Sequence, residues 1–172
     1  MLKVFDSMKG LKFSALMDVY IEGNRENGEE NYPELPANLQ LLRAEEEFYQ
    51  YLQQVFFATP GALYAVWEEA GHYCAALRLE PYMDGVLLTA LETLPTLRRK
   101  GYASMLMNQT VQYLCCEGPV KLYSHVSKRN TASLHTHFSC GFEIIKEHAV
   151  YLDGAVNRNA YTLCLHMEKH GA

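Results

Sequence analysis

The stretch from Val86 to Leu114 reads VLLTALETLPTLRRKGYASMLMNQTVQYL. Its first residues are mostly apolar and predict a strand that ends before Pro95, because proline cannot donate to a β-ladder. Beyond a basic turn, side chains recur three and four residues apart, which predicts a helix with one apolar face. They are Met105, Leu106, Thr110, Val111 and Leu114. We therefore expect a strand, a turn and a helix in this order.

The turn carries three consecutive cations, Arg98, Arg99 and Lys100, followed by Gly101. The backbone N–H groups at a helix start lack intrahelical partners and carry partial positive charge, so they suit a phosphate. Gly101 lets the backbone approach such an anion closely, and the small Ala103 keeps the next turn free of bulk. Neither GxxxxGK[ST] nor GxGxxG occurs in the sequence. The turn predicts a site for a ligand with several negative charges.

Two segments together resemble the GNAT N-acetyltransferases. The segment 98–103 has the form Arg-x-x-Gly-x-Ala and is similar to the family's pyrophosphate loop, Q/R-x-x-G-x-G/A, which binds acetyl-CoA. The segment 130–142 is similar to a late helix of the family, Asn-x-x-Ala/Ser-x-x-x-Tyr-x-x-x-Gly-Phe, in the same order and at the same spacing. His137 stands where that Tyr usually falls. The resemblance covers 62–166, and the first sixty residues match only in general layout.

The rest of the chain predicts further strands around this centre. They cover Lys3–Phe5, Ala62–Trp67, Tyr73–Leu79, Val120–Val126, Glu143–Tyr151 and Tyr161–His166, with turns at Gly71, Asp84-Gly85, Gly118-Pro119 and Asp153-Gly154. A strand, crossover helix and strand normally form a parallel pair. The last two strands are expected to close the sheet as a hairpin. The resemblance implies the GNAT fold, a mixed α/β (α+β) arrangement with a central, mostly antiparallel sheet flanked by helices and with strands four and five splayed apart.

Helices are expected on both sides of this sheet. One is capped by Asp6 or Ser7 and runs to Tyr20, one begins at Asn38, and one covers Thr131–Cys140. The segment Gly23–Pro36 is polar, acidic and rich in turn formers, so it predicts a loop. Its carboxylates either attract a cationic amine or are simply solvated, and the two interpretations are equally open. With 172 residues, of which 49% are hydrophobic and 20% charged, the chain is expected to form one domain, 1–172.

The resemblance implies a cofactor, acetyl-CoA, and a reaction, transfer of its acetyl group to a primary amine by direct attack. The acceptor would be a small-molecule or peptide amine. In the family, backbone groups before the loop pair with the pantetheine arm, and one N–H polarises the thioester carbonyl. The residues that the resemblance assigns to cofactor binding are Leu91, Thr93, Leu94, Arg98, Arg99, Lys100, Gly101, Tyr102, Ala103, Ser104, Asn130 and Ser133.

Two residues are candidates for catalysis. Glu92 is the carboxylate nearest the loop and a candidate general base, acting directly or through water, although a charged residue near a strand end is an equal interpretation. Glu80 is a weaker candidate base. His137 occupies the position of the family's Tyr, which protonates the departing thiolate, and an imidazole of ordinary pKa near 6.5 can do the same. A histidine that only packs or contacts the cofactor remains the alternative.

Composition excludes several other classes. The net charge of −5 argues against nucleic-acid binding, and no apolar run is long enough for a membrane span. His135 and His137 are two residues apart on a helix and point in different directions, so no metal site is expected. Five cysteines, an odd number, and an N-terminus without an apolar core favour a cytoplasmic protein.

Two other functions fit part of the pattern. A GNAT-shaped module that holds CoA with little or no turnover is the alternative that the altered Tyr position supports. A phosphate-binding protein unrelated to CoA would leave the 130–142 pattern unexplained. Because the C-terminal strands of the family often pair between subunits, the resemblance also allows a homodimer.

Overall fold

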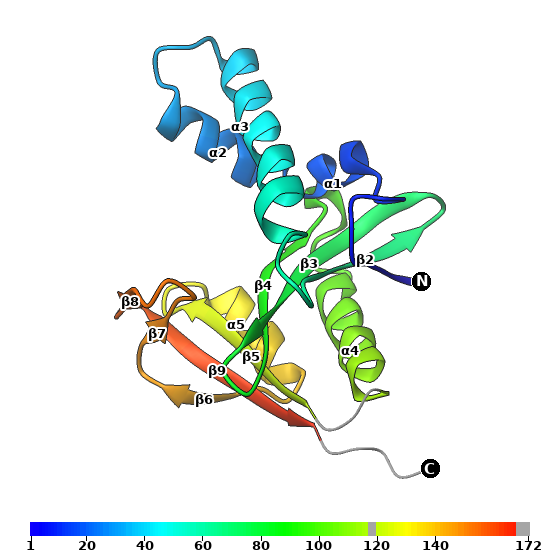
Figure 1. Ribbon diagram of the computed structural model, residues 1–172, viewed down its shortest axis with the longest axis vertical. Coiled ribbons are helices and arrows are strands. Elements are labelled where there is room, and N and C mark those ends of the chain that lie inside the picture. Colours follow the sequence, from blue (N-terminus) through cyan, green and yellow to red (C-terminus); the bar gives the residue numbers. More distant parts are fainter. Residues whose placement is uncertain (117–119, 168–172) are drawn as a thin grey trace.

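The computed structural model describes residues 1–116 and 120–167 (Figure 1). Within these residues, a seven-stranded sheet has the order β1-β2-β3-β4-β5-β9-β6, and β7 and β8 form a separate two-stranded ladder. The strands are β1 (Leu2–Phe5), β2 (Leu63–Glu69), β3 (His72–Tyr82), β4 (Gly85–Thr93), β5 (Val120–Ser127), β6 (Glu143–Lys146), β7 (Ala149–Val150), β8 (Val156–Asn157) and β9 (Ala160–Met167).

The helices lie on both faces of the sheet. They are α1 (Phe13–Val19), α2 (Ile21–Asn31), α3 (Ala37–Tyr51), the π-helical turn η1 (Leu52–Phe56), the 3₁₀ turn η2 (Pro95–Leu97), α4 (Tyr102–Cys115) and α5 (Thr131–Ser139). Figure 1 shows α4 on one side of β2 to β4, and the α2–α3 pair projecting away from the sheet on the other.

The sheet is mostly antiparallel, as the sequence predicted. Strands β2, β3 and β4 form a meander, and its first turn is a two-residue hairpin in which Ala70 and Gly71 both have positive φ, 48° and 84°. Strands β4 and β5 are parallel because α4 carries the chain across the sheet between them. The predicted mixed α/β fold is therefore confirmed.

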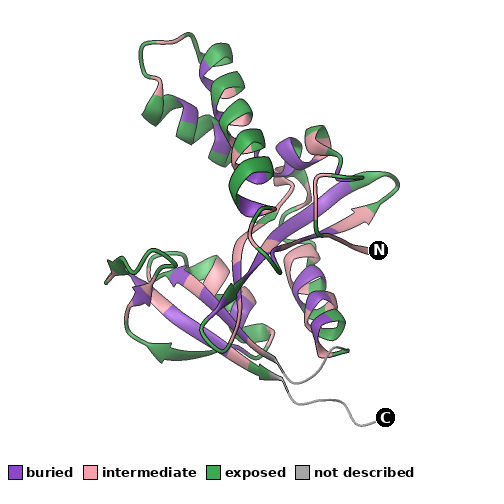
Figure 2. Cartoon of the chain, viewed as in Figure 1, coloured by how far each residue is buried: buried purple, intermediate pink, exposed green. Residues whose placement is uncertain are grey.

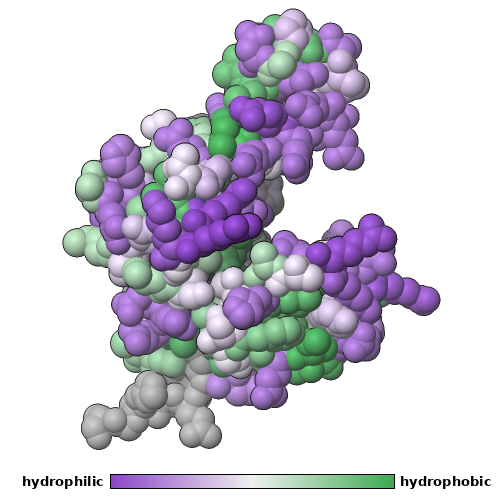
Figure 3. All heavy atoms as spheres, turned by 180° about the vertical axis from the view of Figure 1, so that it is seen from behind, coloured by the Kyte–Doolittle hydropathy of each residue, from purple (hydrophilic) through white to green (hydrophobic). Residues whose placement is uncertain are grey.

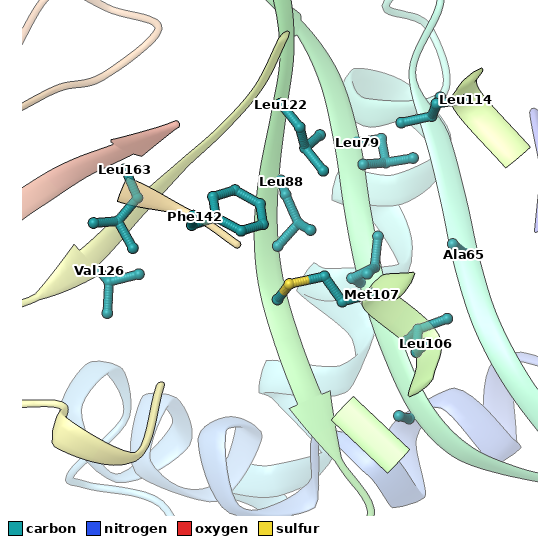
Figure 4. Close-up of a cluster of buried hydrophobic side chains, with 12 residues drawn as sticks. Ala65, Leu79, Leu88, Leu106, Met107, Leu114, Leu122, Val126, Phe142 and Leu163 are labelled. Carbon is teal, nitrogen blue, oxygen red and sulfur yellow. The ribbon is translucent and has the colours of Figure 1, made fainter. Parts of the chain in front are cut away.

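Two apolar cores cover the two faces of the sheet. Beneath α4, Leu106 and Met107 pack on inward-facing strand residues such as Leu79 and Leu88 (Figure 4). On the opposite face, Leu16 of α1 and Phe56 of η1 belong to a second core. The strand centres are buried, whereas α2 and much of α3 are exposed (Figure 2). The sheet is thus held from both sides and can support a site at its middle.

The predicted loop at Gly23–Pro36 is wrong, because most of this segment belongs to α2. Its polar composition gave no helical signal, since only Asn24 and Gly28 are buried. Gly28 packs against α3, and a Cβ there would lie 2.6 Å from the backbone oxygen of Gln40. The glycine that suggested a turn instead permits a close helix–helix contact.

Two other boundaries also differ from the prediction. Helix α1 begins at Phe13, well after Asp6 and Ser7, and Lys12 is its N-cap. The expected closing hairpin is only partly present. Strand β9 pairs with both β5 and β6, and the segment 143–151 divides into β6 and β7, with the Asp153-Gly154 turn in the β7–β8 ladder. The predicted Gly118-Pro119 turn lies outside the described residues.

The α2–α3 contact predicts opposite effects for two glycine substitutions. Gly28→Ala should lower the free energy of unfolding by about 1–3 kcal/mol, because its Cβ overlaps the α3 backbone. Gly23→Ala is the matched control in the same helix, where an added Cβ meets nothing within 4 Å. It should raise the free energy of unfolding by up to about 1 kcal/mol. Urea denaturation measures both, and equal stabilisation by the two variants would contradict the packing.

Candidate active site

Strands β4 and β5 separate at the middle of the sheet. They pair only from Val86 to Leu88 on β4, and beyond this point their hydrogen bonding stops. Ala90 and Leu91 together face the single residue Leu77 on β3, which makes a β-bulge, and Ala90 has a φ of 51°. A cavity of about 590 Å³ lies at this opening. The splay that the resemblance implied between strands four and five is therefore present.

The bulge is held in place from the α1–α2 side of the sheet. The Tyr20 hydroxyl, at the junction of these two helices, donates a 2.6 Å hydrogen bond to the carbonyl oxygen of Ala90. Burial raises the pKa of Tyr20 well above its ordinary value, so the hydroxyl stays a donor. The α1–α2 junction thereby fixes the backbone at the point where β4 leaves β5.

The basic turn reaches α4 through two positive-φ residues. Arg99 has a φ of 62°, and Gly101, the N-cap of α4, has a φ of 84°. The first helical hydrogen bond runs from the Met105 N–H to the Gly101 oxygen at 2.9 Å. The N–H groups of residues 102–104 come before this first bond and so have no acceptor within the helix. A Cβ at Gly101 would meet nothing within 4 Å. This helix start is therefore open to an anion.

The side chains of this turn are not equivalent. Arg98 forms ion pairs with Glu22 of α2 at 2.6 Å and with Glu92 of β4 at 3.7 Å. Arg99 and Lys100 are exposed. The Tyr102 hydroxyl donates to Glu69 at 2.9 Å and so points toward the end of β2. Only Arg99 and Lys100 of the three cations are without a carboxylate partner within the described residues.

Glu92 lies on the face that carries α1 and α2. It pairs with Ala76, its side chain is about half exposed, and it does not line the cavity. Burial raises the pKa of Glu92, the guanidinium of Arg98 lowers it, and the carboxylates of α2 raise it again. A carboxylate with a raised pKa is suited to accept a proton near neutral pH.

His137 lies on α5 and is 1% exposed at the wall of the cavity. Its Nδ1 is 2.8 Å from the Ser133 carbonyl oxygen, so Nδ1–H is the donor, and Nε2 has no hydrogen-bond partner among the described residues. Burial lowers the pKa of His137, an effect that the bond to Ser133 partly opposes. The Asn130 side chain caps α5 by accepting a 3.0 Å bond from the Ser133 N–H. Leu91, Asn130, Ser133 and His137 therefore meet at one cavity.

The other predicted cofactor residues lie outside this cavity. Thr93 and Leu94 continue β4 toward the turn, and the Leu94 N–H donates to the carbonyl oxygen of Cys74 on β3 at 2.9 Å. The basic turn follows directly, and its residues do not line the cavity either. The candidate site is thus an elongated path along β4, with the cavity at the splay and the helix start at the far end.

Sequence reasoning missed the wall of the cavity that faces away from α4 and α5. His125 of β5 lies between the rings of Tyr82 and Tyr151, at centroid distances of 5.4 Å and 5.5 Å. The Tyr82 hydroxyl donates to the Val150 oxygen at 2.7 Å, which docks the β7–β8 ladder here. Figure 3 shows a deep notch between the projecting helices and this part of the molecule. Glu80, the weaker candidate base, was the one signal in the sequence for this wall, because it is a polar residue within a buried strand.

The described residues meet the requirements of neither a metal site nor a membrane-spanning helix. No group of three or more His, Cys, Asp or Glu residues suited to a metal ion occurs among residues 1–116 and 120–167. Among the same residues, no helix has the length and apolar character needed to cross a membrane.

Known proteins share this architecture. The ribosomal-protein-S18-alanine N-acetyltransferase from Escherichia coli gives a TM-score of 0.62 at 19% identity, with 99% of this chain and 97% of that chain covered. The PaiA N-acetyltransferase from Thermoplasma acidophilum, in complex with coenzyme A, gives a TM-score of 0.64 at 11% identity, with 97% of this chain and 99% of that chain covered. A mutant of the spermidine N-acetyltransferase SpeG from Vibrio cholerae gives a TM-score of 0.60 at 20% identity, with 96% of this chain and 93% of that chain covered.

These similarities are too distant in sequence to show more than the fold, and the sequence matches no curated protein. The family is shown by the sequence itself. The model of the acetyltransferase (GNAT) family matches residues 27–142, which is more than half of the chain and includes the basic turn and the 130–142 segment. The chain therefore belongs to the acetyltransferase (GNAT) family, whose members transfer an acetyl group from acetyl-CoA to an amine.

Proposed function

We propose that this chain acetylates a primary amine, with acetyl-CoA along β4 on one side of the splay and the amine on the other. The observation that carries the proposal is the cavity between β4 and β5. It is lined by Leu91 and His137 on the cofactor side and by Glu80 and His125 on the opposite side. An amine and a thioester that enter from the two sides would meet at the bulge.

The residues along β4 and α4 fit acetyl-CoA. The open space beside Gly101 and the N–H groups of residues 102–104 suit the pyrophosphate, and Arg99 and Lys100 add charge. The backbone at Leu91, Thr93 and Leu94 would hold the pantetheine arm. When bound, acetyl-CoA supplies an activated acetyl group as a thioester. Ala90 and Leu91 of the bulge line the cavity. A backbone N–H facing the cavity there would stabilise negative charge on a carbonyl oxygen.

Two carboxylates are proposed to act on the amine. Glu92 has a raised pKa but lies outside the cavity wall and near Arg98, so it would accept the proton through water. Glu80 lines the cavity directly. His137 is the proposed acid for the leaving thiolate. Because its Nδ1–H donates to Ser133, the proton would come from Nε2 of the imidazolium.

We also propose that 1–172 forms one acetyltransferase domain. Support comes from the sheet, in which β1 and β9 lie outside the matched residues 27–142 but pair with β2 and β5.

The five cysteines, all within the described residues, form no disulfide, which supports the cytoplasm as the location. A homodimer remains part of the proposal, with the exposed edge strand β6 as the surface that would pair.

Acetyl-CoA binding is tested by thermal shift. Ligand at about a hundred times its dissociation constant should stabilise the chain by about 2.7 kcal/mol, or roughly 5–10 °C. Gly101→Glu should abolish this shift, because it brings bulk and a like charge to the phosphate. Gly71→Glu is the matched control, since its φ is also 84° and its Cβ also meets nothing within 4 Å. A shift that survives in Gly101→Glu would contradict the proposed phosphate site.

The role of His137 is tested by kinetics on any accepted amine. His137→Phe should lower kcat by about 10²–10⁴-fold with little change in acetyl-CoA affinity, because one acid is lost. His135→Phe, an exposed position on the same helix, should leave kcat unchanged. Burial lowers the pKa of His137 below its ordinary 6.5, so the imidazolium is lost as the pH rises through that lower value.

The alkaline limb of the kcat profile should therefore lie at lower pH in the unsubstituted chain than in His137→Tyr, whose hydroxyl has an ordinary pKa of about 10. Near-normal kcat in His137→Phe with an unchanged profile would assign the proton to water or to another residue. The same assays follow release of free CoA. Binding of acetyl-CoA without any release would favour the CoA-holding module instead.

A further inference from the structure

A row of polar side chains crosses the sheet face opposite α4. Arg78 lies directly across from Thr89 on β4, and His125 directly follows the last β5 residue that pairs with β4. Each has a buried polar atom without a hydrogen-bond partner among the described residues, namely Arg78 Nε, Thr89 Oγ1 and His125 Nε2. Buried polar atoms in folded proteins are nearly always paired. A ligand at this row would supply the missing partners.

Arg78 is the most unusual member of the row. Its guanidinium carbon is 5.2 Å from the ring centroid of Tyr51 and 5.9 Å from those of Phe48 and Phe56. No carboxylate within the described residues lies within ion-pair distance of it, and its side chain makes no hydrogen bond there. Aromatic faces offset part of the cost of burying a cation. The remaining donors of the guanidinium suit a carboxylate, which it can bind in a bidentate manner.

Glu80 is two residues farther along β3, on the same face as Arg78. It is 9% exposed, lines the cavity, and has no ion pair or side-chain hydrogen bond within residues 1–116 and 120–167. Both groups act on Tyr51, whose pKa is raised by burial, lowered by the charge of Arg78 and raised by that of Glu80. Arg78 thus lies over the Tyr51 ring with Glu80 two residues away on the same strand face, and neither has an ion-pair partner among residues 1–116 and 120–167.

We propose that the acceptor is a small amino acid, with its ammonium group at Glu80 and its carboxylate at Arg78. This assignment rests on the proposed function. Glu80 lines the same cavity as the bulge residues Ala90 and Leu91, which is where the amine has to be acetylated. Residues two apart in a strand are separated by about 7 Å, a span that one molecule with neighbouring ammonium and carboxylate groups can bridge.

Charge argues against two other acceptor classes at this position. A carboxylate-free polyamine leaves Arg78 without a counter-ion and brings further positive charge close to it. A phosphate dianion would be repelled by Glu80, which is only two residues away on the same face. The carboxylates of α2 lie on its exposed surface and contribute only screened attraction to any cation. Only a ligand with one charge of each sign satisfies both side chains.

The test compares amino acids with amines of the same side chain. The pairs are L-leucine with isopentylamine, L-phenylalanine with phenethylamine, and L-lysine with cadaverine. Release of CoA from acetyl-CoA is followed for each, and binding of each acceptor is measured by calorimetry in the presence of CoA. In at least one pair, kcat/KM and affinity should be about 10–100-fold higher for the amino acid, the worth of one charged hydrogen-bonded contact.

Arg78→Met keeps an apolar stem among the three rings and removes the charge. It should lower kcat/KM for the amino acid by about 10–100-fold and leave the matching amine unchanged, whereas Arg78→Lys should recover part of the loss. Glu80→Gln should lower kcat/KM for both members of the pair, since both carry the ammonium. The acetyl-CoA thermal shift should persist in all three variants, which shows that they are folded.

Three results would overturn the inference. Amines acetylated as well as their amino acids, or equal losses for both in Arg78→Met, would refute it and leave the acetyltransferase proposal intact. An unchanged rate with L-amino acids in Glu80→Gln would remove Glu80 from the site. Acetyl-CoA binding without transfer to any amino acid or amine would refute both the acceptor class and the proposed function.

Discussion

The β-bulge at Ala90 and Leu91 is the constraint on which the site depends. It ends the ladder between β4 and β5, turns the backbone of β4 and creates the cavity at the splay. Positive φ at Ala90 costs conformational energy in a residue with a Cβ, so neighbouring contacts have to stabilise it. The Tyr20 hydroxyl does so through the Ala90 carbonyl oxygen. At the paired end, Gly85 lets β5 approach, because a Cβ there would collide with the Lys121 carbonyl oxygen.

Sequence patterns predicted the parts of the fold that short-range physics determines. The strand that ends at Pro95, the basic turn and the amphipathic α4 were all readable because apolar periodicity and turn chemistry act over a few residues. The same holds for the helix predicted over Thr131–Cys140, which the structure has as α5 over Thr131–Ser139. Helix α2 was not readable. Its stability depends on α3 packing closely over Gly28, and that contact leaves no periodic apolar signal in α2 itself.

The candidate site divides in the same way. Its proposed cofactor side consists of consecutive residues in two segments, and sequence motifs alone pointed to Leu91, Asn130, Ser133 and His137, which line one cavity. Its proposed acceptor side combines single residues from β3, β5 and the β7–β8 ladder. Glu80 and His125 gave no motif, because only the register of three strands brings them to one cavity. Strand register is a long-range property, and one sequence carries little information about it.

The two sides of the site are also linked electrostatically through Arg98. It joins the basic turn to Glu22 of α2 and to Glu92 of β4, so the turn, α2 and β4 share one ion-pair network. All three side chains are about half exposed, and such pairs contribute at most about 1 kcal/mol each. A pyrophosphate at the proposed site beside the turn would compete for the same guanidinium. The Arg98 pairs are therefore weak enough to exchange, whereas Tyr20, buried and bonded to the Ala90 carbonyl oxygen, keeps the backbone of the bulge in place.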